Sequence, residues 1–88
     1  MFKLCYFVPE SHLEVTKTAL FESGAGRIGD YDCCAGQCKG QGQFRPLDGS
    51  SPYLGRSGEV EQVEEFRVEL VCRDELIRAA VQALKTSH

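Results

Sequence analysis

Two stretches of the chain alternate in side-chain character with a period of two, which is typical of β-strands. In residues 2–8 (FKLCYFV) both alternating sets are largely apolar, which predicts a strand buried on both faces. In residues 65–72 the two sets differ: Phe66, Val68, Leu70 and Cys72 alternate with Glu65, Arg67 and Glu69. This second strand should therefore bury one face, while its other face is wet or covered by another subunit. We expect Phe2, Tyr6, Phe66, Val68 and Leu70 to form the core of the sheet.

Apolar residues at helical spacing predict two helices. Ser11, followed three residues later by Glu14, matches a capping box that opens the first helix after Pro9, and Gly24 is a natural stop for it. Asp74 is expected to cap the second helix. The apolar stripe of that helix consists of Leu76, Ile77, Ala80, Val81 and Leu84.

The segment between these elements, residues 24–58, is rich in glycine. Two strand-like pieces lie inside it, at residues 31–39 and 43–47, and Gly40 and Gly42 suit a hairpin or a bulge between them. Residues 48–58 read as a loop. The order strand, helix, two or three strands, helix predicts a single α+β domain over residues 1–88, a ferredoxin-like split β-α-β sandwich whose final edge strand is missing.

Charge and cysteine content narrow the possible functions. Ten Lys and Arg against thirteen Asp and Glu give a net charge of −3, which argues against nucleic acid as a partner. No run approaches the roughly 18 apolar residues of a membrane span. Five cysteines, two of them adjacent at Cys33 and Cys34, disfavour a paired disulfide framework and favour a reducing cytoplasm.

Residues 24–29 (GAGRIG) match the letters of a dinucleotide-binding fingerprint, with Asp48 about twenty residues further on. That site needs a strand before the glycines and a helix after them, so that a phosphate meets the helix N-terminus. Here a helix precedes and a strand is expected to follow. The glycines are therefore predicted to form a tight helix-to-strand turn. Arg27 and Arg45 flank the glycine-rich region and could hold an anion; solvation or a subunit salt bridge is the alternative.

The thiols suggest a second kind of site. Cys34 and Cys38 would point to the same face of an extended strand, and a histidine could join them around a metal ion. The competing interpretation is that they are small buried side chains that happen to be thiols. A nucleophilic cysteine would need a neighbouring base, for which His12 and His88 are the two candidates.

Several spaced motifs together resemble one known family. They are FVPE (residues 7–10), GAGRIGDYD (24–32), GQGQFRPL (40–47), PYLG (52–55) and VEE (63–65). They are similar to the small domain inserted in bacterial members of the NGG-one-interacting-factor-three family, a domain that also occurs as a free-standing short protein. The resemblance implies a fold like those of the CutA and PII proteins, which assemble as trimers through their sheets.

The chain departs from this family at two positions. Gly36 stands where relatives often carry a bulky aromatic residue, and His88 matches the start of a family segment, His-Pro-Tyr-Glu-Glu-Pro, that opens the last strand. The chain stops there, so one edge of the sheet should be bare. The family's two-metal site belongs to another, larger domain, and no hydrolase activity carries over to these residues.

The sequence therefore predicts a non-enzymatic, self-associating regulatory or binding module, a trimer of identical chains with no cofactor. Its small ligand is not identified, and neither nucleic acid nor a membrane is expected as a partner. The candidate ligand-binding residues are Arg27, Arg45 and Tyr53. The alternative is a thiol-based metal-binding or metal-sensing protein that uses Cys34, Cys38 and His88.

Overall fold

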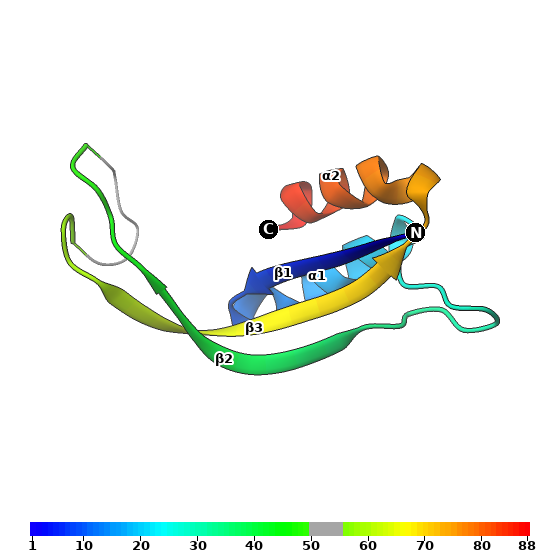
Figure 1. Cartoon of the computed structure of the whole chain (residues 1–88), viewed down its shortest axis with the longest axis horizontal. Coiled ribbons are helices and arrows are strands. Elements are labelled where there is room, and N and C mark those ends of the chain that lie inside the picture. The colour runs from blue at the N-terminus through cyan, green and yellow to red at the C-terminus, as the bar shows by residue number, and fades with distance from the viewer. Residues whose placement is uncertain (50–55) are drawn as a thin grey trace.

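The computed structural model describes residues 1–49 and 56–88, which form a three-stranded antiparallel sheet and two helices (Figure 1). The elements are β1 (Phe2–Val8), α1 (Glu10–Glu22), β2 (Gly36–Phe44), β3 (Glu61–Cys72), a 3-10 turn (Asp74–Leu76) and α2 (Ile77–Ser87). The strand order is β1–β3–β2, so β3 lies at the centre and pairs with both neighbours. The predicted fold class, a small α+β domain, is confirmed.

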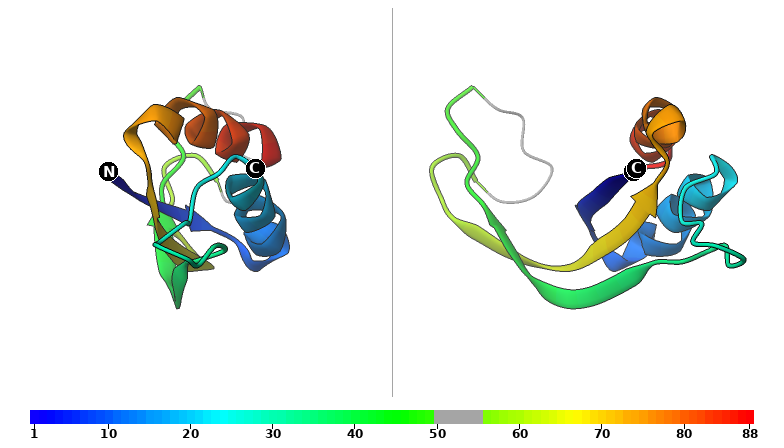
Figure 2. Two further views of the ribbon diagram at one scale, coloured as in Figure 1. Left: turned by 90° about the vertical axis from the view of Figure 1, so that its right-hand side faces the viewer. Right: turned by 45° about the vertical axis from the view of Figure 1, so that its right-hand side comes forward.

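Both helices cover the same face of the sheet, as the turned views of Figure 2 show. The period-two pattern of the strands explains this arrangement, because it places all their buried apolar residues on one side. The core between sheet and helices consists of Tyr6, Val8, Leu13, Leu20, Ala25, Val68, Leu70, Cys72 and Ala80. In the described part of the chain, no helix lies on the opposite face of the sheet.

One buried hydrogen bond ties β1 to α1. Thr16 is fully buried, and its hydroxyl donates to the helix carbonyls of His12 and Leu13 at 2.8 and 2.9 Å. The Tyr6 hydroxyl lies 3.0 Å from the same Thr16 Oγ1. Because the single hydroxyl proton of Thr16 is directed at those carbonyls, Tyr6 is the donor and Thr16 the acceptor of this contact.

The predicted core needs correction at its margins. Tyr6, Val68 and Leu70 are buried as expected, whereas Phe66 is only partly buried and Phe2 is 48% exposed. The expectation that β1 is buried on both faces is wrong for this chain, because Phe7 is 62% exposed. The second apolar set of β1 lies on the face that no helix covers.

Strand β2 differs from the prediction of two strand pieces with a hairpin or bulge between them. It is one continuous strand, and Gly40 and Gly42 lie inside it opposite Glu65 and Val63 of β3. Neither glycine has a positive φ, so neither makes a turn. The chain reverses only after Phe44.

The two helix caps also differ from the prediction. Helix α1 begins at Glu10, and the Ser11 hydroxyl lies 2.9 Å from Nδ1 of His12, so the expected capping box does not form. Asp74 pairs with the N-terminal ammonium group of Met1 and makes no side-chain cap on α2. A 3-10 turn precedes this helix and changes the direction of the chain between β3 and α2.

The outer parts of β2 and β3 extend beyond the helices as a curved two-stranded ribbon (Figure 1). β1 pairs with β3 from Phe66 to Cys72, whereas residues 61–65 of β3 pair with β2 alone. The molecule is therefore elongated, with extents of 47 × 24 × 20 Å. Within residues 1–49 and 56–88, no helix has the length and apolar character needed to cross a membrane.

We expect Leu20→Ala to lower the free energy of unfolding by about 3–4 kcal/mol, because it leaves a cavity at a position with no solvent exposure. Val15→Ala is the matched control: it lies on the same helix but is 51% exposed, so its cost should stay below about 1 kcal/mol. Urea unfolding followed by circular dichroism measures both values. Equal costs for the two variants would contradict the assigned core.

Burial raises the pKa of the Tyr6 phenol above its ordinary value, and this outweighs the opposing effect of the hydrogen bond with Thr16. The folded state then holds the phenolic proton more tightly than the unfolded state. This contribution to stability is present below the unfolded pKa of about 10 and is lost as the pH rises through the folded pKa. Between pH values of about 9 and about 11, the wild type should therefore lose more unfolding free energy than Tyr6→Phe. Parallel pH curves for the two proteins would refute this.

Candidate functional site on the open face of the sheet

The face of the sheet that points away from the helices, here called the open face, carries the most unusual set of side chains. On β1 it presents Lys3, Cys5 and Phe7, and on β3 Glu61, Val63, Glu65, Arg67, Glu69 and Val71. On β2 it presents Gly36, Cys38, Gly40, Gly42 and Phe44. It therefore combines charged groups, two thiols and an exposed aromatic ring.

Glu69 holds the two cations of this face together. Its carboxylate lies 3.1 Å from Nζ of Lys3 and 2.8 Å from Nη2 of Arg67. The hydrogen bond from Lys3, followed by the charge of Arg67, lowers the pKa of the Glu69 carboxyl below its ordinary value. These groups form an ordered chain of charges across β1 and β3.

Arg67 also contacts a thiol. Its Nε donates a hydrogen bond to Sγ of Cys5 over 3.2 Å. This bond is the main reason that the pKa of the Arg67 guanidinium is raised above its ordinary value, with the charge of Glu69 adding to it. On the other side, Cys38 of β2 is the residue directly opposite Arg67 in the strand register. The guanidinium therefore lies between two thiols of neighbouring strands.

Strand β2 leaves its backbone open on this face at Gly36 and Gly40, whereas the side chain of Glu65 lies against Gly42. An added Cβ at Gly36 or Gly40 would meet no other atom within 4 Å, so packing inside the chain does not require glycine there. A groove of about 220 Å³ runs over this surface, and its lining includes Phe7, Cys38 and Arg67. Glycine inside a strand often marks a place where a ligand or another backbone comes close.

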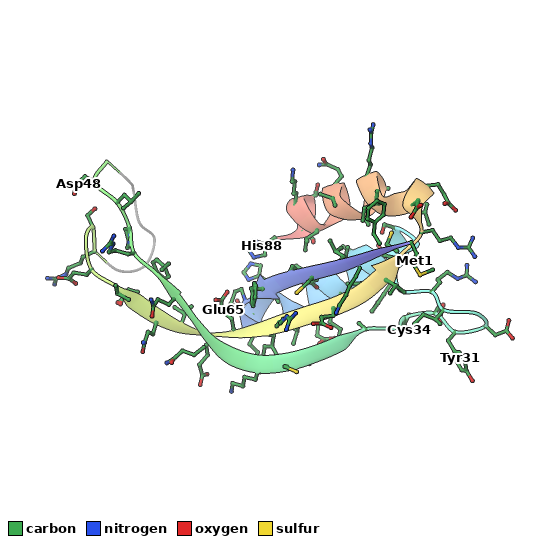
Figure 3. All side chains as sticks on the ribbon, viewed as in Figure 1. Met1, Tyr31, Cys34, Asp48, Glu65 and His88 are labelled. Carbon is green, nitrogen blue, oxygen red and sulfur yellow. The ribbon has the colours of Figure 1, made fainter. Side chains whose placement is uncertain are left out.

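A second groove, of about 360 Å³, lies where β3 meets the loop before β2. Its lining includes Lys3 and Glu69 of the open face together with Ile28 and Cys34 of the loop. Figure 3 shows Cys34 at the end of this loop, where it joins β2, and Tyr31 at its tip, far from the projecting ribbon. The two grooves therefore lie toward opposite ends of the same face.

The structure does not bring the predicted ligand residues together. Arg27 follows Gly26, whose N–H donates to the carbonyl of Val71, whereas Arg45 follows Phe44, which pairs with Glu61. Ten residues of β3 separate those two points, which corresponds to about 33 Å of strand. Figure 3 shows the same separation between the labelled Tyr31 and Asp48. Tyr53, the third predicted residue, lies outside the described residues.

The three predicted metal ligands are also apart. Cys34 lies in the loop before β2 and not on the strand, so its expected alignment with Cys38 is lost. Cys38 is on the open face, while the ring of His88 lies on the helix side, 5.8 Å from the ring of His12. In the described part of the chain, no group of three or more His, Cys, Asp or Glu is placed to hold a metal ion.

The glycines adopt positive φ as predicted, but they do not form a tight helix-to-strand turn, because α1 ends at Glu22 and β2 begins only at Gly36. Gly24, Gly26 and Gly29 all have positive φ, and a helix precedes them. The N–H of Gly26 donates to Val71 at 2.8 Å, and its carbonyl accepts from the N–H of Cys34 at 2.8 Å. This segment thus continues the edge of β3 beyond the start of β2.

The site residues that sequence reasoning missed are Cys5, Phe7 and Arg67. The alternation in residues 65–72 placed Arg67 on an outer face, but the partners of that face depend on the pairing of β3 with β1 and β2. The strand register is set by contacts between distant segments, so the sequence carried no local signal for a contact between Arg67 and Cys5.

The fold and its open face define a small α+β domain, and comparison with known proteins shows where it belongs. No family model matches the chain. A GTP cyclohydrolase 1 type 2 homolog of Bacillus subtilis is 42% identical over 86 residues, which are 98% of this chain and 23% of the relative. The same-named protein of Halalkalibacterium halodurans is 38% identical over 88 residues, 100% of this chain and 24% of the relative.

Among solved structures, a Bacillus cereus protein related to NIF3 aligns with a TM-score of 0.86 and 37% identity. This match covers 98% of the chain and 21% of the larger protein. Over its whole length the chain is therefore homologous to one segment of the NGG-one-interacting-factor-three (NIF3) family, and the resemblance drawn from its motifs is confirmed. The chain spans about a quarter of the length of these relatives.

We expect Gly26→Ala to lower the free energy of unfolding by about 2 kcal/mol or more, through its positive φ and through contact. An added Cβ would lie 2.8 Å from the ring of Phe21 and 3.0 Å from the carbonyl oxygen of Cys34. Gly29→Ala is the matched control, since Gly29 shares the positive φ but has open space around it, and should cost about 1 kcal/mol. Thermal or urea unfolding compares them, and a larger cost at Gly29 would contradict the packing described here.

Proposed function

We propose that this chain is a non-enzymatic module of the NIF3-family type that associates with copies of itself through its open face. The observation that carries the proposal is the position of Phe7, a ring 62% exposed on a face that no helix covers and on the same face as the open backbone of Gly36 and Gly40. An aromatic ring on a sheet face gains most when a second surface removes it from water.

The occupant best suited to this face is a second copy of the chain. Two cations, Lys3 and Arg67, lie on this face with three carboxylates, Glu61, Glu65 and Glu69, so the face carries a formal net charge of only −1. A face with nearly balanced charge can meet a copy of itself with little net repulsion, whereas a strongly charged partner gains little from it. The glycines of β2 allow the copies to approach closely.

The arrangement of strands supports a ferredoxin-like, PII- and CutA-like fold as the finer description. The order β1–β3–β2 with both helices on one face corresponds to a split β-α-β sandwich without the strand that pairs with the outer edge of β1. Among the described residues, that edge of β1 has no partner strand. A trimer is the assembly that the PII and CutA resemblance favours, and it would bring neighbouring chains close to this edge.

The relatives are named as homologs of a GTP cyclohydrolase, but they are about four times as long as this chain. We propose that the segment represented here supplies association rather than chemistry. The predicted ligand residues Arg27 and Arg45 lie far apart, and so do the predicted metal ligands Cys38 and His88. A small ligand, if the module takes one, is better accommodated by the grooves of the open face.

Light scattering coupled to gel filtration should give a native mass near three chains for the wild type. Phe7→Ser should shift the mass toward that of one chain, because it removes the apolar anchor of the open face without disturbing the buried core. Val15→Ser is the control, since this exposed valine lies on α1, away from that face. A wild-type mass of one chain at all concentrations, or equal effects of the two variants, would reject the proposal.

A further inference from the structure

The larger of the two grooves described above, about 360 Å³ where β3 meets the loop before β2, holds groups that self-association alone does not explain. Its volume lies within the range of small-molecule sites. Ile28, Ala35 and Val71 supply apolar surface along it, and Ile28 is 54% exposed. An apolar ligand that covered this surface would remove it from water and so gain free energy.

Two opposite charges lie beside this apolar surface. Lys3 and Glu69 both line the groove, and Nζ of Lys3 lies 3.1 Å from Oε2 of Glu69. The other oxygen of that carboxylate, Oε1, lies 2.8 Å from Nη2 of Arg67. Arg67 therefore holds Glu69 in place, whereas the side chain of Lys3 is long and 61% exposed, so it is free to turn toward a ligand.

A backbone donor faces the same region. The carbonyl of Val71 accepts a hydrogen bond from the N–H of Gly26 over 2.8 Å, so both backbone groups of Val71 point to the loop side of β3. Within residues 1–49 and 56–88, the N–H of Val71 has no backbone acceptor on that side. Lys3 is the residue opposite Val71 in the strand register, so this N–H and the ammonium group of Lys3 lie on neighbouring strands. Together they can bind one carboxylate.

We propose that this groove binds a small apolar α-amino acid in its zwitterionic form. The carboxylate of the ligand accepts hydrogen bonds from Nζ of Lys3 and from the N–H of Val71, and its ammonium group donates to Oε2 of Glu69. Its apolar side chain covers Ile28 and Ala35. Lys3 thereby exchanges Glu69 for the ligand, so one ion pair becomes two while the net charge of the site stays the same.

The pairing of one cation with one anion makes the site selective for a zwitterion. A carboxylic acid without an amino group would bring its negative charge beside Glu69, and an amine without a carboxylate would bring its positive charge beside Lys3. Like charges in close contact disfavour binding, so each half of the ligand alone is rejected. An amino acid with a charged side chain is also disfavoured, because the apolar walls would remove that charge from water.

This inference names a ligand class for the binding module proposed above, and it rests on that proposal only because Lys3 and Glu69 belong to the open face. Binding itself does not depend on association, since every group that contacts the ligand comes from one chain. Ligand binding and self-association can therefore be tested separately.

The test is a titration of the whole chain with L-leucine, followed by the NMR shift of the amide group of Val71. Measurements use Phe7→Ser chains, or wild type diluted until light scattering gives the mass of one chain, so that the open face is accessible. We expect saturation with a Kd of about 1 mM. Isocaproate and isopentylamine keep the carbon skeleton of leucine but lack its ammonium group or its carboxylate, and each should bind at least about tenfold more weakly.

Lys3→Met should weaken leucine binding about tenfold, whereas Lys85→Met, an equal loss of charge on the exposed side of α2, should leave it unchanged. Gly36→Val should abolish binding, because the added side chain has open space around it and enters the groove. Gly40→Val is its matched control, since Gly40 also has open space but lines the other groove.

The proposal is overturned if leucine gives no saturable shift up to about 20 mM, which is far above the expected Kd. It is also overturned if either half molecule binds as tightly as leucine, or if Gly36→Val leaves the Kd as it was. A wild type that is always a single chain would reject the proposed self-association alone, because leucine binding is measured on single chains.

Discussion

The central position of β3 is the constraint on which the rest of the structure depends. This strand pairs with β1 along one edge and with β2 along the other, so its alternation of side chains fixes which residues of all three strands share a face. Val68 and Leu70 point to the helices and anchor the core, while Arg67 and Glu69 point the other way. A shift of β3 by one residue would exchange these two faces.

Because both helices cover the core side of the sheet, charged, thiol and exposed aromatic side chains lie on the opposite side. Phe7, the thiols of Cys5 and Cys38 and the charge chain from Lys3 to Arg67 all lie there. Helix α1 is fastened to the core side of the sheet by the buried hydroxyl pair of Tyr6 and Thr16. The proposed association of copies would use this exposed surface.

Much of this fold could be predicted from the sequence, because the strong patterns are local. The alternation in residues 65–72, the helical spacing and the positive φ of Gly24 and Gly26 were all correctly anticipated. The predictions were wrong where contacts with a distant segment outweighed the local preference of a residue. Gly40 and Gly42 resemble turn residues, yet pairing with β3 holds them extended, and the charge of Asp74 is used on the N-terminus of Met1 rather than on a cap.

The candidate site was less predictable for the same reason. Arg27 and Arg45 flank one glycine-rich segment in sequence, but that segment includes the whole of β2, so they lie at opposite ends of an elongated molecule. The contact of Cys5 with Arg67 joins residues 62 positions apart and depends on the strand register. Homology to a segment of the NIF3 family identifies the fold unit but not which side chains of distant segments meet on its open face.

Copies of this chain are proposed to cover the open face in solution, and hydroxyl-radical footprinting over a range of protein concentrations tests this most directly. The ring of Phe7 is 62% exposed in the single chain, and that of Tyr31, in the loop before β2, is 74% exposed. The account predicts that oxidation of Phe7 relative to Tyr31 falls as the concentration rises. A ratio that stays constant from dilute to concentrated protein would contradict it.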